Sequence, residues 1–137
     1  MRYYVPMTDC IFCKIIDGSV PAHVVYEDSD FLAFLDIRPL SPGHTLVVPK
    51  KHYRYVWDVP TDRDTSPNIA AYFELVQKIA RALQRVSKTD QVRMKVIGDE
   101  VPHAHVWVFA DPDTAKGSKD TFAENAELLR AALSQEP

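Results

Sequence analysis

Several features that would point to particular classes of protein are absent from this sequence. No stretch reaches the ~18 apolar residues of a membrane span, and the opening MRYYVPMTD lacks the apolar region of a secretory signal peptide. The 16 basic and 19 acidic side chains leave a formal net charge of −3, so no excess positive charge exists to grip a long nucleic acid. We therefore expect a cytoplasmic protein with neither a membrane nor a polynucleotide partner.

Cysteine is scarce, and nothing divides the chain. The only cysteines are Cys10 and Cys13, spaced C-x-x-C, which in a reducing compartment indicates metal or redox chemistry more than a structural disulfide. There is no internal repeat, low-complexity tract or long linker in the 137 residues. A chain of this length buries about two thirds of its unfolded surface, so we expect residues 1–137 to form one domain.

Five segments carry strand patterns, placed before and after one long helical pattern. The predicted strands are AHVVYE (22–27), FLAFLDI (31–37), TLVVPK (45–50), VRMKVIG (92–98) and HAHVWVF (103–109). The long helix is predicted to begin at Ser66 as its N-cap, with Pro67 in the first position. Its apolar residues recur at helical spacing and are predicted to be core: Ile69, Phe73, Val76, Ile79, Ala80 and Leu83.

A second helical pattern lies near the C-terminus. Thr121 and Glu124 resemble a capping box, and the apolar residues after them predict a short amphipathic helix: Leu128, Leu129, Ala132 and Leu133. Strands that cluster around helices in this order predict an α+β fold with an antiparallel sheet.

The segment VPHAHVWVFA places His103, His105 and Trp107 at alternating positions. In a strand these three share one face, while the small apolar residues between them share the other. A neutral imidazole near pH 7 is a competent nucleophile that can attack phosphorus, although a strand histidine can also simply hydrogen-bond inside a sheet.

A set of four possible metal ligands and one aspartate are further candidates for binding. Cys10 and Cys13 with two histidines would complete a closed, structural Cys2His2 zinc site, for which His52 and His103 are the candidates. His52 follows two lysines after the third strand, where a solvated loop histidine is also typical. Asp36 closes FLAFLD and is either a turn-initiating aspartate or a ligand for sugar hydroxyls.

Three blocks of the chain, taken together, resemble the histidine triad (HIT) family of nucleotide hydrolases and transferases, in its bacterial zinc-containing branch. They are CIFCKIIDGSVPAHVVYED, FLAFLDIRPLSPGHTLVVPKKH and VPHAHV, in the expected order and spacing over roughly residues 10 to 109. The resemblance implies a HIT-like α+β fold: a five-stranded antiparallel sheet with one long helix and shorter flanking helices. It also implies a homodimer in which two sheets join.

The resemblance also implies an activity. His105, as the middle motif histidine, would attack the α-phosphorus of a nucleoside phosphate derivative such as a phosphoramidate, an acyl nucleotide or a dinucleoside polyphosphate. Water would then hydrolyse the nucleotidyl-histidine intermediate and release a nucleoside monophosphate.

The same resemblance assigns the binding residues. Asp36 would bind ribose hydroxyls, His44 would lie close behind the site, and the walls around a purine-type base would be Phe12, Ile15 and Phe34. The implied ligands of a structural zinc are Cys10, Cys13, His52 and His103.

Two departures from the family pattern concern the chemistry. Where the family has its third motif histidine this chain has Trp107, which is still expected to contact the substrate. The preceding loop GDEVP lacks the family's Gly-Gln and a polar phosphate-binding residue. An indole N–H does not transfer its proton to a leaving group near neutral pH. We therefore expect the hydrolysis of derivatives with poor leaving groups to be slowed most.

These departures keep a second class of function open, a zinc-stabilised nucleotide-binding module with little or no turnover. A C-x-x-C thiol oxidoreductase is a third class. It needs a reactive thiolate at a helix start, whereas the predicted strands and zinc partners argue against one here.

Overall fold

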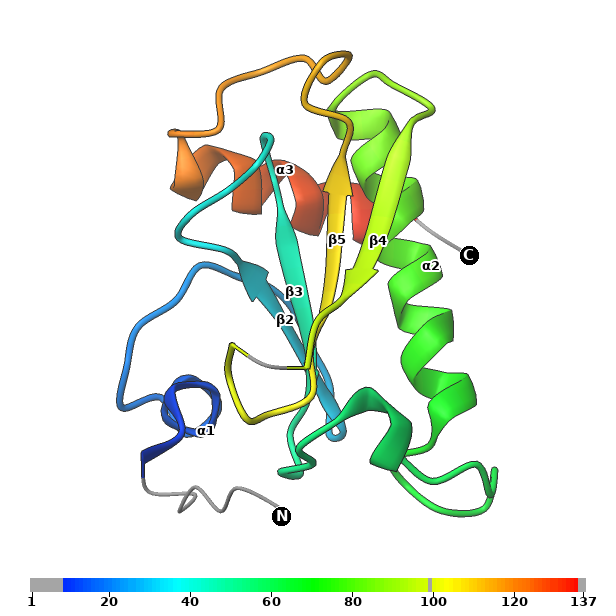
Figure 1. The fold of residues 1–137 in the computed structure, drawn as a ribbon. Helices are drawn as coiled ribbons and strands as arrows, with labels where there is room; N and C mark the ends of the chain where they lie inside the picture. The colour runs from blue at the N-terminus through cyan, green and yellow to red at the C-terminus, as the bar shows by residue number, and fades with distance from the viewer. Residues whose placement is uncertain (1–8, 99, 136–137) are drawn as a thin grey trace.

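The computed structural model describes residues 9–98 and 100–135, and within them the chain forms a five-stranded antiparallel sheet (Figure 1). The spatial order is β1-β2-β3-β5-β4, so the two edges are β1 and β4. The strands are β1 (Val24–Glu27), β2 (Phe31–Leu35), β3 (Thr45–Pro49), β4 (Val92–Val96) and β5 (Val106–Ala110). The first four lie within the segments predicted for them, and β5 overlaps its segment but ends one residue beyond it. The α+β class and the antiparallel sheet are confirmed. The prediction of one domain over residues 1–137 extends past the described residues at both ends.

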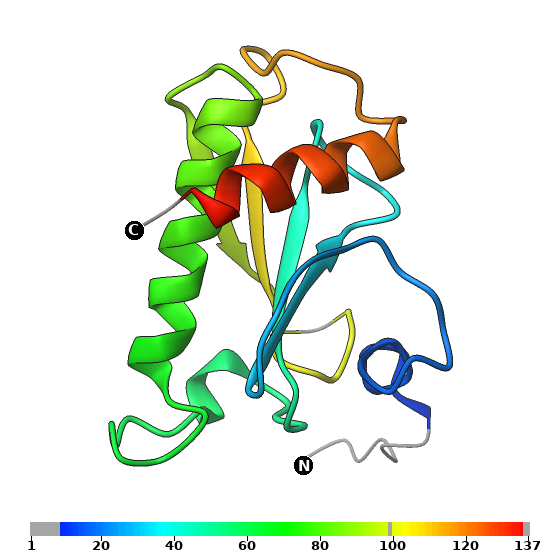
Figure 2. The same cartoon turned by 180° about the vertical axis from the view of Figure 1, so that it is seen from behind.

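Helices cover the two faces of the sheet unequally. The helices α2 (Ile69–Val86) and α3 (Phe122–Ser134) lie on one face, as Figure 2 shows, and the short α1 (Ile11–Ile16) lies on the other side. A single turn of 3-10 helix, η2 (Val56–Asp58), follows β3. In the part of the chain that the structure describes, no helix has the length and apolar character to cross a membrane.

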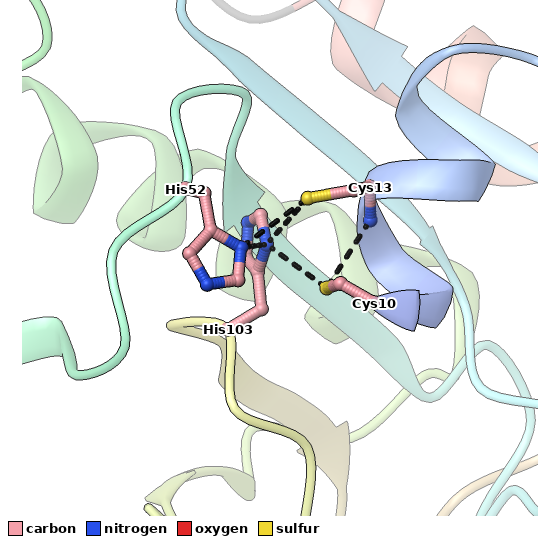
Figure 3. Close-up of side chains that lie close together, drawn as sticks. All are labelled: Cys10, Cys13, His52 and His103. Carbon is pink, nitrogen blue, oxygen red and sulfur yellow. Dashed lines mark hydrogen bonds between the residues drawn. The ribbon is translucent and has the colours of Figure 1, made fainter. Parts of the chain in front are cut away.

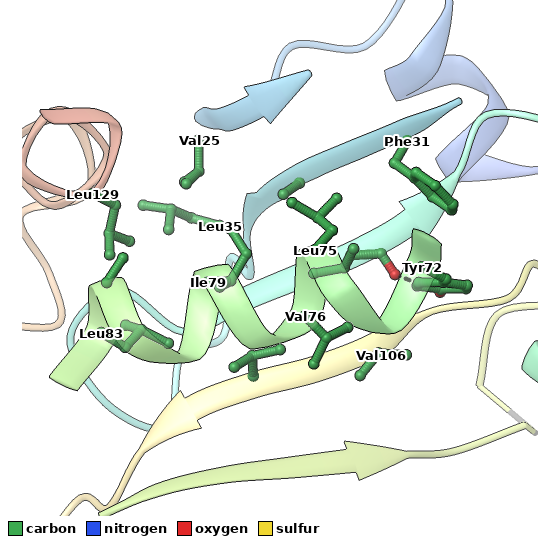
Figure 4. Packing of buried hydrophobic residues seen from close by; sticks show 14 of the residues in the cluster. Val25, Phe31, Leu35, Tyr72, Leu75, Val76, Ile79, Leu83, Val106 and Leu129 are labelled. Carbon is green, nitrogen blue, oxygen red and sulfur yellow. Dashed lines mark hydrogen bonds between the residues drawn. The ribbon is translucent and has the colours of Figure 1, made fainter. Parts of the chain in front are cut away.

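The main core lies between the sheet and the pair α2 and α3 (Figure 4). Of the predicted stripe on α2, Val76, Ile79 and Leu83 are buried and the other three are partly buried at its margins. Tyr72, which the pattern did not single out, is fully buried, and its hydroxyl donates a hydrogen bond to the Val47 carbonyl of β3 at 2.7 Å. This bond satisfies the one polar atom that the ring carries into the core.

The predicted N-cap of α2 and the predicted capping box of α3 are wrong, although α3 does begin directly after Thr121. The N-cap of α2 is Asn68 rather than Ser66, because the Asn68 side-chain oxygen accepts the Ala71 N–H at 2.9 Å. The capping box at Thr121 does not form, since the Thr121 hydroxyl donates to the Ser118 carbonyl instead of accepting from the first turn of α3. In both places a local turn decides which polar group faces the helix end.

The segment 103–109 is only partly a strand, because β5 begins at Val106. Pro49 on the neighbouring β3 has no N–H to continue the ladder beyond the Val47–Val106 pair. Ala104 donates its N–H to the Tyr53 carbonyl instead. The predicted alternation still holds: Ala104, Val106 and Val108 enter the main core, while His105 and Trp107 line a cavity on the opposite face.

Candidate active site and zinc centre

Two cysteines and two histidines converge on the face of the sheet that α1 covers (Figure 3). Their ligand atoms all lie within 4.8 Å of one another, although they come from α1, from the loop after β3 and from the segment before β5. His103 Nδ1 lies 3.5 Å from the sulfur of Cys10 and 3.5 Å from that of Cys13. His52 Nδ1 lies 3.2 Å from Cys13 Sγ and 3.1 Å from His103 Nδ1.

The cysteine pair is positioned by a short helix that the sequence patterns did not predict. Cys10 is the N-cap of α1, and its sulfur accepts the Cys13 N–H at 3.4 Å. Residues three apart in a helix share one side, so both sulfurs face the histidines. The signal was present in the apolar spacing of Phe12, Ile15 and Ile16, but six residues are too few for a periodicity argument.

The two histidines are prepared for metal binding. His103 donates Nε2–H to the Pro49 carbonyl at 2.8 Å, which leaves the Nδ1 lone pair directed at the two sulfurs. Burial lowers the pKa of His103 to about 4, and burial also lowers the pKa of His52, so both rings favour the neutral, ligating form. Two neutral imidazoles and two sulfurs are the donor set of a tetrahedral structural zinc site.

The thiols argue against a redox role. Cys10 does stand at a helix start, which is the position that a reactive thiolate needs. Burial raises the pKa of the Cys13 thiol to about 12, with a further contribution from its hydrogen bond and proximity to Cys10. A thiol with so high a pKa is a poor redox nucleophile, whereas a coordinated cation deprotonates it outright.

A cavity of about 680 Å³ opens beside the Cys2His2 cluster, within the ordinary range for small-molecule sites. Six residues predicted for catalysis or substrate binding line it: Phe12, Ile15, Phe34, Asp36, His105 and Trp107. Arg38 and Glu100 also line it, and neither was predicted. Single charges in loops carry no pattern that would have marked them.

His105 has a defined orientation in this cavity. Its Nδ1–H donates to the His103 carbonyl at 2.8 Å, so Nε2 is the nitrogen that keeps its lone pair. The edge of the Phe12 ring packs against the imidazole with the ring centroids 5.1 Å apart. The bond to His103 ties the orientation of His105 directly to the Cys2His2 cluster.

Asp36 forms the turn that was one of its two predicted roles, and it also lines the cavity. In the turn, one carboxylate oxygen accepts the Arg38 N–H at 2.9 Å. The other oxygen, Oδ2, lies 3.6 Å from His44 Nε2.

His44 lies behind the cavity rather than on its wall. It is fully buried against the rings of Trp107 and Phe109, and its Nδ1 accepts the Leu40 N–H at 3.1 Å. Burial lowers the pKa of His44, and the nearby Asp36 carboxylate opposes that shift. His44 therefore meets a ligand only through Asp36 and Trp107, which it supports from behind.

Comparison with known proteins identifies the family. The model of the HIT domain family matches residues 17–113, which include the strands and His105. The chain belongs to the HIT domain family. An uncharacterised HIT-like protein from Methanocaldococcus jannaschii is 44% identical over 103 residues, covering 72% of this chain and 76% of that protein.

Two other relatives add chemical detail. A zinc-bound histidine triad family protein from Mycobacterium smegmatis has 33% identity and a TM-score of 0.78, over 95% of this chain and 96% of that one. The adenylylsulfatase HINT3 from Arabidopsis thaliana is 37% identical over 106 residues, covering 73% of this chain and 51% of that protein. The HIT-like fold and the zinc cofactor are confirmed, and the family relationship indicates a hydrolase-type enzyme. The role of each individual site residue stays a prediction.

Proposed function

We propose that this HIT protein is a nucleotidyl hydrolase or transferase that works through a nucleotidyl-histidine intermediate on His105. The observation that carries the proposal is the fixed tautomer of His105, whose Nδ1–H is bound to the His103 carbonyl within a ligand-sized cavity. An imidazole held in this way presents Nε2 as a nucleophile without first having to lose a proton.

The cavity walls support a nucleotide-type ligand. The edge-to-face pair Phe12 and Phe34, with ring centroids 5.5 Å apart, and the nearby Ile15 offer an apolar wall for a purine-type base. Asp36 offers a carboxylate oxygen for ribose hydroxyls at the same cavity. Apolar walls and sugar contacts discriminate poorly between bases, so we expect broad base tolerance.

The reaction would proceed in two displacements at phosphorus. His105 Nε2 forms a bond to the α-phosphorus while the bond to the leaving group breaks, and the electron pair departs with that group. Water then attacks the nucleotidyl-imidazole and releases the nucleoside monophosphate and the free imidazole. Cys10, Cys13, His52 and His103 would hold zinc, which supplies a structural cross-link and takes no part at phosphorus.

Trp107 narrows the leaving groups that this site can expel. A positioned general acid typically contributes ~10² to 10⁴-fold, and the indole N–H is far too weakly acidic to transfer its proton. Acidic leaving groups such as phosphate, sulfate or carboxylate depart without a proton, whereas amines need one. The relative named as an adenylylsulfatase supports a substrate with an acidic leaving group.

The test is release of nucleoside monophosphate from four compounds: adenylyl sulfate, an acyl adenylate, a dinucleoside polyphosphate and adenosine phosphoramidate. His105→Asn should reduce turnover by at least ~10³-fold while zinc content and nucleotide affinity persist, because it removes a group that acts only in the chemical step. His23→Asn is the matched control, since His23 is exposed and does not line the cavity. Mass spectrometry of quenched reactions should find the nucleotidyl adduct on the peptide that contains His105.

Two outcomes would contradict the proposal. Undiminished hydrolysis by His105→Asn would exclude His105 as the nucleophile. Nucleotide binding by the wild type with no hydrolysis of any of the four compounds would establish the alternative, a zinc-stabilised binding module.

We also infer a homodimer in which two sheets join at an edge. At the β1 edge the Arg130 side chain donates to the Val24 carbonyl at 2.6 Å and α3 packs nearby, whereas the residues of β4 are mostly exposed. An unprotected edge strand favours pairing with another strand, so β4 is the expected interface. Light scattering should give twice the mass of the chain. A monomer at working concentration would contradict this model.

The cytoplasmic location of the protein stays a prediction.

A further inference from the structure

Strand β4 brings two cationic side chains to the face of the sheet that carries the cavity. In its antiparallel register with β5, Arg93 lies opposite Phe109 and Lys95 lies opposite Trp107. Side chains of directly opposed residues share a face, so both cations lie on the side of Trp107. Neither cation lines the cavity itself, and Lys95 reaches it only through Trp107. No motif of the sequence marks either residue, because β4 shows only an alternating strand pattern.

The two cations differ in their partners. Arg93 Nη2 lies 3.5 Å from a carboxylate oxygen of the buried Asp111, which offsets its charge. The Lys95 ammonium lies over the Trp107 ring, 5.6 Å from its centroid, and among residues 9–98 and 100–135 no carboxylate pairs with it. A cation held on an indole face keeps its charge available to a further anionic ligand.

Across the sheet, the proposed nucleoside site lies on one side of His105 and Lys95 lies on the other side. Phe34 and Asp36 belong to β2 and the turn after it, His105 leads into β5, and Lys95 belongs to the next strand, β4. A nucleoside seated between α1 and β2 with its α-phosphorus at His105 therefore extends its remaining substituent toward β4. That substituent is the leaving group.

We propose that Lys95, held against Trp107, binds the anionic leaving group and makes the site selective for nucleotidyl derivatives that expel sulfate, phosphate or carboxylate. This inference deepens the proposed function and rests on it for the orientation of the substrate. As the Nε2–P bond forms and the P–O bond breaks, the departing oxygen keeps the electron pair and gains a unit of negative charge. No proton is transferred, and a nearby ammonium stabilises that charge where Trp107 cannot protonate it.

The test compares adenylyl sulfate with adenosine phosphoramidate, which differ in the charge of the leaving group. Lys95→Met keeps the length of the stem and removes the charge, so it should lower kcat/KM for adenylyl sulfate ~10-fold and change it less than twofold for the phosphoramidate. Lys95→Arg should restore most of the activity. Arg93→Met is the matched control on the same face and strand, and it should show no such selectivity. Equal losses with both substrates, or no loss with either, would overturn the proposal.

A binding measurement separates this proposal from the failure of the proposed function. In His105→Asn, which has no nucleophile, the affinities of both compounds can be measured without hydrolysis. Adding Lys95→Met should weaken the binding of adenylyl sulfate ~10-fold and leave the binding of the phosphoramidate unchanged. If the wild type hydrolyses nothing but this difference appears, the enzyme assignment fails and Lys95 still recognises the anion. If the two affinities change equally, the role of Lys95 is wrong whatever the turnover.

Discussion

The two faces of the sheet are stabilised in different ways. On one face, α2 and α3 bury a continuous apolar cluster whose largest members, such as Ile79, Leu83 and Leu129, are fully enclosed. On the other face, a smaller cluster contains Cys10 and Phe12, lies beside the Cys2His2 group and leaves a cavity of about 680 Å³ open. The first face is closed by apolar packing, whereas the second stays open for a ligand and needs another source of stability.

The length of the covering helix explains the difference. The helix α2 has 18 residues and α1 has six, of which only Phe12 is buried. An isolated helix shorter than ~12 residues is marginal in water, so α1 needs a tether to hold its place. With zinc bound, the Cys2His2 cluster would join α1 to two distant segments and provide this tether, because a structural metal contributes its binding free energy to folding.

Of the three substitutions, Cys13→Ala should lower the stability of the protein most. It removes one of four zinc ligands, so we expect loss of the metal and a fall of more than ~4 kcal/mol in the free energy of unfolding. Elemental analysis and denaturant unfolding measure the two effects. Lys14→Ala, in the same helix but outside the cluster, should keep one zinc per chain. Wild-type protein with a zinc content near zero and freely titratable thiols would contradict the proposal that zinc holds α1 in place.

Ile79→Ala probes the opposite face. Ile79 is fully buried in the main core, and truncation of such a side chain costs about 2–5 kcal/mol through lost apolar contact and a residual cavity. Chemical denaturation should show this loss, while the folded fraction keeps its zinc and its nucleotide affinity. Leu128→Ala, at a site that is 54% exposed, should change stability by less than ~0.5 kcal/mol. Loss of zinc in Ile79→Ala would mean that the two faces are not independent.

Trp107→His should have the smallest effect of the three substitutions, and it should change the rate of hydrolysis rather than the stability. A histidine at this cavity position can donate a proton, so hydrolysis of adenosine phosphoramidate should rise about tenfold, toward the lower end of what a positioned acid supplies. Hydrolysis of adenylyl sulfate should not rise, because sulfate leaves without a proton and the substitution removes the ring over which Lys95 lies. Trp107→Gln, which removes the indole without adding an acid, is the control. A uniform change with both substrates would mean that the indole only fills space.

Residue identity and local pattern are enough to predict much of this molecule. The five strand patterns, the family motifs and the four zinc donors all lie in the amino-acid sequence itself, and the fold and the zinc cofactor are confirmed. The errors are local and polar: the N-cap of α2, the capping box at Thr121 and the start of β5. In each case a nearby turn or a proline decides which hydrogen bond forms, and periodicity of apolar residues carries no information about that choice.

What the sequence determined by itself is which chemical groups the protein has and which face of each strand they occupy. The alternation of His105 and Trp107 with core residues follows directly from the period of a strand. Only the tertiary structure decided which of these groups meet. Cys10 and His103 lie 93 residues apart, and Lys95 reaches Trp107 only through the pairing of β4 with β5. Such contacts depend on strand order and register, which are set by packing of the whole chain and leave no mark on local sequence.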